Sequence, residues 1–185
     1  MPSQRPTDVI LDAAMASVLD VGLRRTTLAD VARRAGVSRM TVYRQYPDLN
    51  SIVGALLTRE LTALLAEVES ELAPLPTARE RLVTAAVKTV QQMDDHPLYR
   101  RVLDLDPELL LPLIVDRFGS TQRAAMDLIA EQVREGHQDG SIRAVDPDRA
   151  ATAILLTAQS FVFSARLVDD AALDELGHMW EAYLS

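Results

Sequence analysis

Helix start and stop signals recur along the whole sequence and separate stretches in which apolar residues return every three or four positions. The first stretch follows Thr7, which can cap a helix, and ends at Gly22, a residue that commonly terminates one. Runs of four to eight β-branched or aromatic residues, which would indicate strands, are missing. The chain is therefore expected to be all-α.

The same signals predict about nine helices. In Asp106-Pro107 and Asp146-Pro147 a capping residue precedes a proline, a combination that opens helices. Ser120 can cap a helix that ends near Gly136, and Asp169 or Asp170 can cap the last one. The other expected helices run from Thr27 to Gly36, from Ser38 to Pro47, from Asp48 or Asn50 to about Glu71, from Thr77 to about Met93, and around Pro97–Leu103.

Charge is unevenly distributed. Residues 1–50 hold seven arginines and five aspartates and so carry a net charge of +2. The rest of the chain carries −10, which gives the total of −8. Such asymmetry is typical of a DNA-contacting domain attached to an acidic one. No signal peptide or membrane span is recognisable, and cysteine is absent, so a cytoplasmic protein without disulfides is expected.

Residues 26–57 contain two short amphipathic helices joined by a turn. Gly36 lies where a positive φ is needed, and Ser38 can cap the second helix. The first helix has an apolar stripe of Val31, Ala32 and Ala35, and Val37, Val42 and Tyr46 form one around the second. Two such helices form a helix-turn-helix, whose second helix can enter a major groove of DNA.

This segment resembles the DNA-binding signature of the TetR family of transcription regulators. The family pattern A-x-x-A-G-V-S is matched by residues 32–38, and T-x-Y-x-x-[FY] by residues 41–46. The resemblance implies a helix-turn-helix domain over residues 1–50 and a helical ligand-binding and dimerisation domain over residues 51–185. The family often has a phosphate-contacting lysine where this sequence has Leu49.

Eight residues are predicted to contact DNA. Arg39 and Arg44 suit guanine or phosphate, Gln45 suits adenine, and Met40 and Thr41 suit a thymine methyl group. Tyr43, Thr27 and the amides at the helix starts suit phosphate oxygens. Ser38 and Thr27 are expected to cap helices whether or not DNA is bound.

No catalytic, metal or cofactor site is predicted. His96, His137 and His178 are not spaced as metal ligands are. The sequence also shows no Ser-His-Asp arrangement and no Gly-rich phosphate loop. The resemblance implies that a small-molecule effector binds in the C-terminal domain, and polar or aromatic side chains that interrupt apolar helical faces there are the candidate lining residues. The candidates are Gln91, Gln92, Met93, Tyr99, Met126, Gln159, Phe161 and Phe163, and the alternative is that the Met and Phe residues are core.

The final two helices, expected at residues 148–167 and 171–184, are predicted to form the dimer interface. Their apolar stripes would pair with those of a second copy in a four-helix bundle, or pack only on their own domain. The residues assigned to this interface are Ala150, Ala153, Ile154, Thr157, Phe161, Leu173, Leu176, Trp180 and Tyr183.

The sequence thus predicts a ligand-responsive regulator, a repressor that binds palindromic operator DNA as a homodimer. Activation of transcription is equally compatible with the residues, because repression or activation depends on where the operator lies relative to the promoter. A different class remains open as well: a helical small-molecule carrier or enzyme with a vestigial DNA-binding domain.

Overall fold

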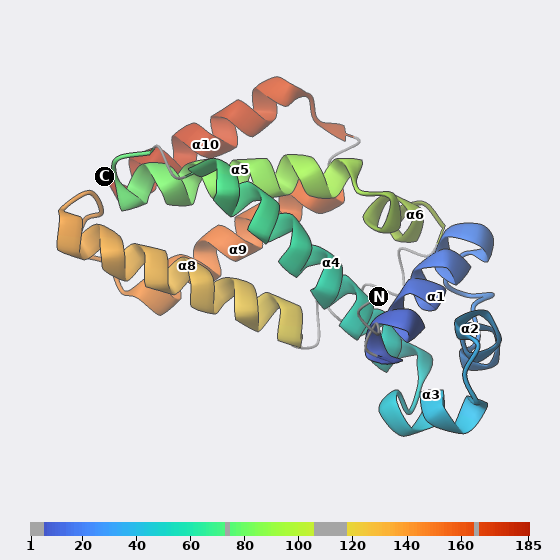
Figure 1. Ribbon diagram of the computed structural model, residues 1–185. Helices are drawn as coiled ribbons and strands as arrows, with labels where there is room; N and C mark the ends of the chain where they lie inside the picture. The colour runs from blue at the N-terminus through green and yellow to red at the C-terminus, as the bar shows by residue number, and fades with distance from the viewer. Residues whose placement is uncertain (1–5, 73–74, 106–117, 165–166) are drawn as a thin grey trace. The chain divides into compact units, whose positions relative to one another are not determined.

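In the computed structural model, the described residues 6–72, 75–105, 118–164 and 167–185 form nine helices and no strand (Figure 1). The all-α prediction is confirmed. The helix expected to begin at Asp106-Pro107 lies outside the described residues. The helices are α1 (Pro6–Val21), α2 (Leu28–Ala35), α3 (Arg39–Gln45), α4 (Leu49–Leu72), α5 (Ala78–Asp95), α6 (Pro97–Leu105), α8 (Ser120–Asp139), α9 (Pro147–Ser164) and α10 (Asp170–Leu184).

Side chains that cap backbone groups determine where several helices begin. At the start of α5, the Thr77 hydroxyl accepts a hydrogen bond from the Glu80 N–H at 3.2 Å, and the Glu80 carboxylate accepts one from the Thr77 N–H at 3.2 Å. Where the sequence left two candidates, the structure selects Asp48 for α4 and Asp169 for α10. Their carboxylates accept hydrogen bonds from the N–H groups of Ser51, at 2.7 Å, and Ala172, at 3.1 Å.

Two helix ends differ from the expectation. α1 begins at Pro6, so Thr7 lies within its first turn. α8 continues past Gly136 to Asp139, and the chain turns at Gly140, whose φ is 74°. Gly136 is buried, and a Cβ there would lie 2.3 Å from Cδ1 of Ile142. This glycine therefore permits a close approach of Ile142 to the helix and does not end it.

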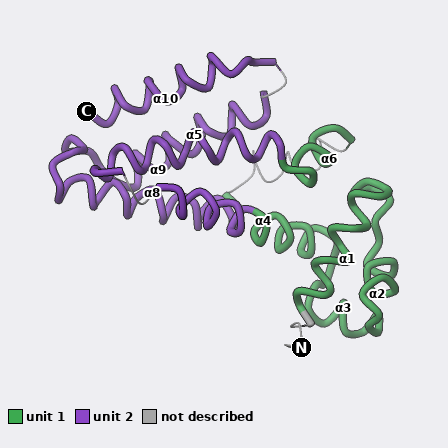
Figure 2. The backbone as a smooth tube through the Cα atoms, turned by 45° about the horizontal axis from the view of Figure 1, so that its top comes forward, with its two compact units in different colours: residues 1–60, 96–119 green, residues 61–95, 120–185 purple. Residues whose placement is uncertain are grey.

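The chain divides into two units, which Figure 2 shows in different colours. Unit 1 comprises residues 1–60 and 96–119, and unit 2 comprises residues 61–95 and 120–185. The sequence placed a boundary at residue 50, but the first half of α4 and all of α6 belong to unit 1. α6 joins this unit because it packs against α1, with Leu98 and Val102 buried.

Each unit has its own apolar core. In unit 1, the first half of α4 and α6 bury side chains together with α1, α2 and α3: Ile10, Val18, Val31, Val42, Ile52, Leu56, Leu98 and Val102. In unit 2, one cluster is formed by α5, α8, α9 and α10: Leu82, Val83, Val90, Val133, Ile142, Ala150, Ile154, Val162, Leu176, Trp180 and Leu184. No helix within the described residues is long and apolar enough to cross a membrane.

Candidate functional site

α2 and α3 of unit 1 form two short helices joined by a tight turn. Thr27 caps α2: its hydroxyl accepts a hydrogen bond from the Asp30 N–H at 3.1 Å. At the other end Gly36 adopts a φ of 67°, and its N–H and that of Val37 bond back to carbonyls of α2. Because this left-handed conformation suits glycine, the turn that reverses the chain is determined locally by the sequence.

Ser38 begins the second helix two residues after the turn. Its side-chain oxygen accepts a hydrogen bond from the Thr41 N–H at 3.1 Å and lies 2.8 Å from the Thr41 hydroxyl. The capping role predicted for Ser38 is therefore present in the fold itself, as it is for Thr27. The first N–H groups of α3 point out of the helix start, a geometry that suits phosphate oxygens.

The sides of α3 differ sharply in exposure. Val42 is fully buried and Tyr46, which ends the helix, is 8% exposed, whereas Met40 is 73% and Tyr43 49% exposed. Ser38, Arg39, Arg44 and Gln45 are also exposed, and Thr41 is half-buried. We call Arg39, Met40, Tyr43, Arg44 and Gln45 the outer face of α3. It places most of the side chains predicted to contact DNA on a single short helix.

The arginines of this region fall into two groups. Arg33 pairs with Asp30 at 3.0 Å and Arg34 with Asp20 at 2.6 Å. Hydrogen bonds from Thr27 and then from Arg33 lower the pKa of Asp30, so the carboxylate stays charged. No carboxylate of the described residues pairs with Arg39 or Arg44. The outer face of α3 therefore carries two guanidinium groups available to an anion or to a base edge.

The predicted effector residues do not converge on one site. Gln91 is exposed, and so is Phe163, at 39%. Tyr99 belongs to unit 1, where it is buried and its hydroxyl donates to the Leu57 carbonyl at 3.1 Å. The remaining candidates are half-buried residues of unit 2: Gln92, Met93, Met126, Gln159 and Phe161.

Two buried polar atoms on α5 lack a partner among the described residues. They are the Thr89 hydroxyl and the Gln92 side-chain carbonyl oxygen, three positions apart and hence on one side of the helix. Gln92 was predicted, but Thr89 was missed. A threonine in the middle of an otherwise apolar helical face was the available signal. Unpartnered buried polar atoms point to a ligand or a water molecule.

The structure places most of the predicted dimer residues inside unit 2. Ala150, Ile154, Leu176 and Trp180 are at most 2% exposed, and Trp180 donates a hydrogen bond to the Thr157 hydroxyl at 2.9 Å. Phe161, Leu173 and Tyr183 pack against the same core, so only Ala153 is exposed. The four buried residues are therefore core residues of their own unit, whereas the assignment of the others to a dimer interface stays a prediction. α9 has two apolar sides, and the one with Ala150 and Ile154 faces its own unit.

The other side of α9 is exposed and also largely apolar. It consists of Ala153, Leu156, Ser160 and Phe163, at spacings of three and four residues, with Leu156 47% exposed. Met179 on α10 is 46% exposed. We call these five residues the α9–α10 outer face.

Within the described residues, no group of three or more His, Asp or Glu side chains could hold a metal ion.

The turn at Gly36, the cap at Ser38 and the exposed, arginine-bearing α3 define a helix-turn-helix DNA-binding protein. Residues 10–56 match the family model for bacterial regulatory proteins of the tetR family. Over 181 residues the chain is 39% identical to an HTH-type transcriptional regulator of Mycobacterium bovis, covering 95% of this chain and 92% of the relative. The chain belongs to the TetR family of bacterial transcription regulators.

Solved structures of transcription regulators share the fold. The TetR family repressor AlkX from Dietzia sp., implicated in biodegradation of n-alkanes, superimposes with a TM-score of 0.76 at 20% identity, over 97% of this chain and 95% of that one. The regulator FadR from Bacillus subtilis, solved in complex with stearoyl-CoA, gives a TM-score of 0.65 at 16% identity, over 96% and 99% of the two chains. At such identities the likeness concerns the fold alone.

Proposed function

We propose that this transcription regulator is a ligand-responsive repressor that binds a palindromic operator as a homodimer, with the outer face of α3 in the major groove. The observation that carries the proposal is the pair of exposed arginines on that face, neither of which has a carboxylate partner among the described residues. Arg39 and Arg44 share that face with Met40, Tyr43 and Gln45, which supply an apolar contact, a phosphate partner and an amide for base edges.

The test compares two exposed arginines that differ in their partners. A binding sequence is first selected from random duplex DNA with the full chain. Arg44→Ala should weaken binding to it by about five- to hundredfold, since one base contact contributes about 1–3 kcal/mol. Tyr43→Ala should weaken it as well. Arg33→Ala is the control, because Arg33 lies on α2 and pairs with Asp30.

A correctly folded Arg44→Ala chain and a Tyr43→Ala chain that both bind as tightly as wild type would show that another surface contacts DNA. A gain of function gives an independent check. Leu49 is the first residue of α4 and half-buried. Leu49→Lys adds a cation where the family often has one, so binding should tighten for all sequences and depend more steeply on salt.

Dimerisation is proposed to use the α9–α10 outer face. Small and large residues alternate along α9, with Ala153 before Leu156 and Ser160 between Leu156 and Phe163, so two symmetry-related helices could approach closely and interlock. An apolar surface of this kind on a water-exposed helix commonly marks an interface. A two-fold dimer would present its two α3 helices to two halves of a palindrome.

The effector is proposed to bind within unit 2, against Thr89 and Gln92 of α5. A ligand with a hydrogen-bond donor and a largely apolar body would satisfy the unpartnered Gln92 oxygen. The stearoyl-CoA bound to FadR has a long apolar chain, which is compatible with this description. Ligands found by screening should bind Gln92→Leu more weakly and should lower DNA affinity. A ligand that binds tightly without changing DNA affinity would contradict the switch.

A further inference from the structure

A small apolar cluster joins the second half of α4 to α5 within unit 2. Its buried members, Leu64, Val68 and Leu72, follow one another at spacings of four residues and form one row along α4. Ala85 and Met93 of α5 pack against this row. We call these five residues the α4–α5 cluster. It is separate from the larger core of unit 2, although Met93 packs against both.

Two polar side chains lie on the side of α5 that packs on this row. Thr89 is four positions after Ala85 and four before Met93, so the three side chains line up along the helix. Gln92 is three positions after Thr89 and lies beside it. The Thr89 hydroxyl and the Gln92 side-chain oxygen are buried, and neither has a hydrogen-bond partner among the described residues. Because buried polar atoms without partners cost free energy, a polar group between the two helices would be stabilised there.

The charged residues of these two helix segments do not favour an anionic ligand. Residues 61–72 of α4 contain three glutamates and no basic residue. The three basic residues of α5 already have carboxylate partners: Arg79 pairs with Glu181, Arg81 with Glu135 and Lys88 with Glu71. An anion buried between the helices would find no free cation on either segment, which makes its burial unfavourable.

The two unpartnered atoms select a group that both donates and accepts hydrogen bonds. The Gln92 oxygen can only accept, whereas the Thr89 hydroxyl can donate. A carboxamide matches both, because its N–H donates and its carbonyl accepts, but an ester or a carboxylate has no donor. The row from Leu64 to Leu72 extends about 12 Å along the helix axis and offers apolar contacts to an alkyl chain.

We propose that unit 2 binds an uncharged alkyl carboxamide, or a ligand with an equivalent donor–acceptor head, between α5 and the second half of α4. Thr89 donates to the carbonyl of the head, Gln92 accepts from its N–H, and the alkyl chain lies against the α4–α5 cluster. The second half of α4 moves away from α5 to admit the ligand, while the larger core stays closed because it is separate. Any effect of this ligand on DNA affinity rests on the proposed function, whereas the binding itself does not.

Calorimetric titration of the full chain without DNA tests this ligand class with three probes that share one alkyl chain. Decanamide offers a donor and an acceptor, methyl decanoate an acceptor alone, and decanoate a charged acceptor. Decanamide should bind about tenfold more tightly than either of the others, because each of them leaves the buried Gln92 oxygen without a donor. Decanoate also brings a charge for which these helix segments have no free cation.

Two substitutions assign the hydrogen bonds, and each has a matched control on α5. Gln92→Leu should abolish the preference for decanamide over methyl decanoate, because it removes the acceptor that only the amide N–H can use. Thr89→Val should weaken binding of both probes by about two- to tenfold, since both have a carbonyl. Both chains should stay folded, because each change removes a buried atom that lacks a partner. Gln91→Leu, at an exposed position, and Thr84→Val, on another side of the helix, should bind as wild type does.

Absence of decanamide binding, equally tight binding of decanoate, or an unchanged preference in Gln92→Leu would overturn the proposal. DNA affinity on a selected duplex, measured with and without decanamide, tests the consequence separately and should fall when decanamide is bound. Decanamide that binds through Gln92 without changing DNA affinity would refute the ligand response in the proposed function and leave the site standing. A chain that binds the duplex but not decanamide would refute the site alone.

Discussion

Two glycines of unit 1 lie in open space but differ in backbone conformation. A Cβ on Gly36 or on Gly54 would meet no atom within 4 Å, yet only Gly36 has a positive φ, at 67°. Gly36→Ala should therefore destabilise the chain by about 1–2 kcal/mol, the cost of a left-handed residue with a side chain. Gly54→Ala, inside α4, should instead stabilise it by about 0.5–1 kcal/mol.

Urea denaturation of both variants checks these opposite signs. The pair is matched, because each substitution adds one methyl group to a site without steric contact. If Gly36→Ala were as stable as Gly54→Ala, the turn between α2 and α3 would not depend on the left-handed conformation of residue 36.

The sequence predicted individual residues well where their partners are close in the chain. Thr27, Ser38 and Thr77 each bond to the N–H three residues further on, so the spacing alone identifies them as caps. Gly136 was misjudged because its role depends on Ile142 reaching back to the helix, a contact that no local pattern encodes.

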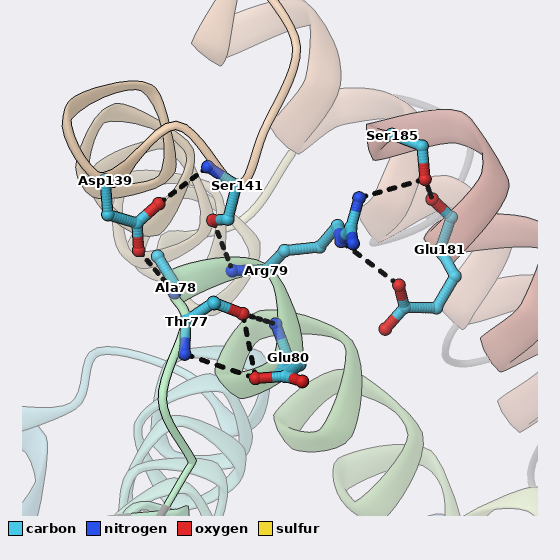
Figure 3. A network of polar contacts seen from close by, with 8 residues as sticks. All are labelled: Thr77, Ala78, Arg79, Glu80, Asp139, Ser141, Glu181 and Ser185. Atoms are coloured by element: carbon cyan, nitrogen blue, oxygen red, sulfur yellow. Dashed lines mark hydrogen bonds and ion pairs between the residues drawn. The ribbon is translucent and has the colours of Figure 1, made fainter.

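At the scale of elements, the start of α5 is held by more than its own capping box (Figure 3). Asp139, at the end of α8, accepts hydrogen bonds from the Ala78 N–H and the Ser141 N–H, both at 2.8 Å. The Ser141 hydroxyl accepts from the Arg79 N–H at 3.2 Å, and the Arg79 side chain reaches Glu181 of α10 and Ser185, which caps that helix. This network joins three segments of unit 2 that are distant in sequence.

Asp139 gives this network a dependence on pH. Hydrogen bonds, chiefly with Ser141, lower the pKa of Asp139 below its ordinary value of 3.8. Its contribution to stability is thus present above that value and lost as pH falls through the lower folded-state pKa. Asp139→Asn should lower the melting temperature at about pH 7, and its difference from wild type should shrink below about pH 4.

Calorimetry of the full chain at both pH values measures this effect. Asp127→Asn is the control, an exposed aspartate on α8 whose removal should leave the melting temperature unchanged. A loss for Asp139→Asn that is equally large at both pH values would mean that its charge is not involved.

Helical periodicity predicted the elements but not their orientation. α9 has apolar residues on two sides, and periodicity alone does not say which side meets its own core. The sequence assigned Ile154 and Trp180 to a partner, whereas these bulky side chains fill the interior of unit 2. The surface left over, with Leu156 and Phe163, is recognisable only once the fold is known.

At the scale of the whole molecule, the division into units depends on long-range contacts. The signature in residues 26–57 predicted the helix-turn-helix and the outer face of α3 because both are local. The assignment of α6 to unit 1 could not be predicted, since Leu98 and Val102 complete a core whose other members lie more than 40 positions earlier.

The proposed dimer gives a prediction at this scale. Leu156→Glu places a charge in the middle of the α9–α10 outer face, so the full chain should change from dimer to monomer in sedimentation at micromolar concentration. Because Leu156 is 47% exposed in the single chain, Trp180 fluorescence should not change. Leu128→Glu on α8, where the leucine is 56% exposed, is the matched control and should remain dimeric.

The most direct test of the central claim, that this chain reads DNA sequence as a dimer, is selection from random duplex DNA with the full-length protein. The enriched sequences should contain an inverted repeat whose half-site centres are about 34–36 Å apart, or a multiple of that spacing. Enrichment of this repeat should be reduced with Arg44→Ala and unchanged with Arg33→Ala. Selected pools without a shared sequence, or with one lacking two-fold symmetry, would contradict the account.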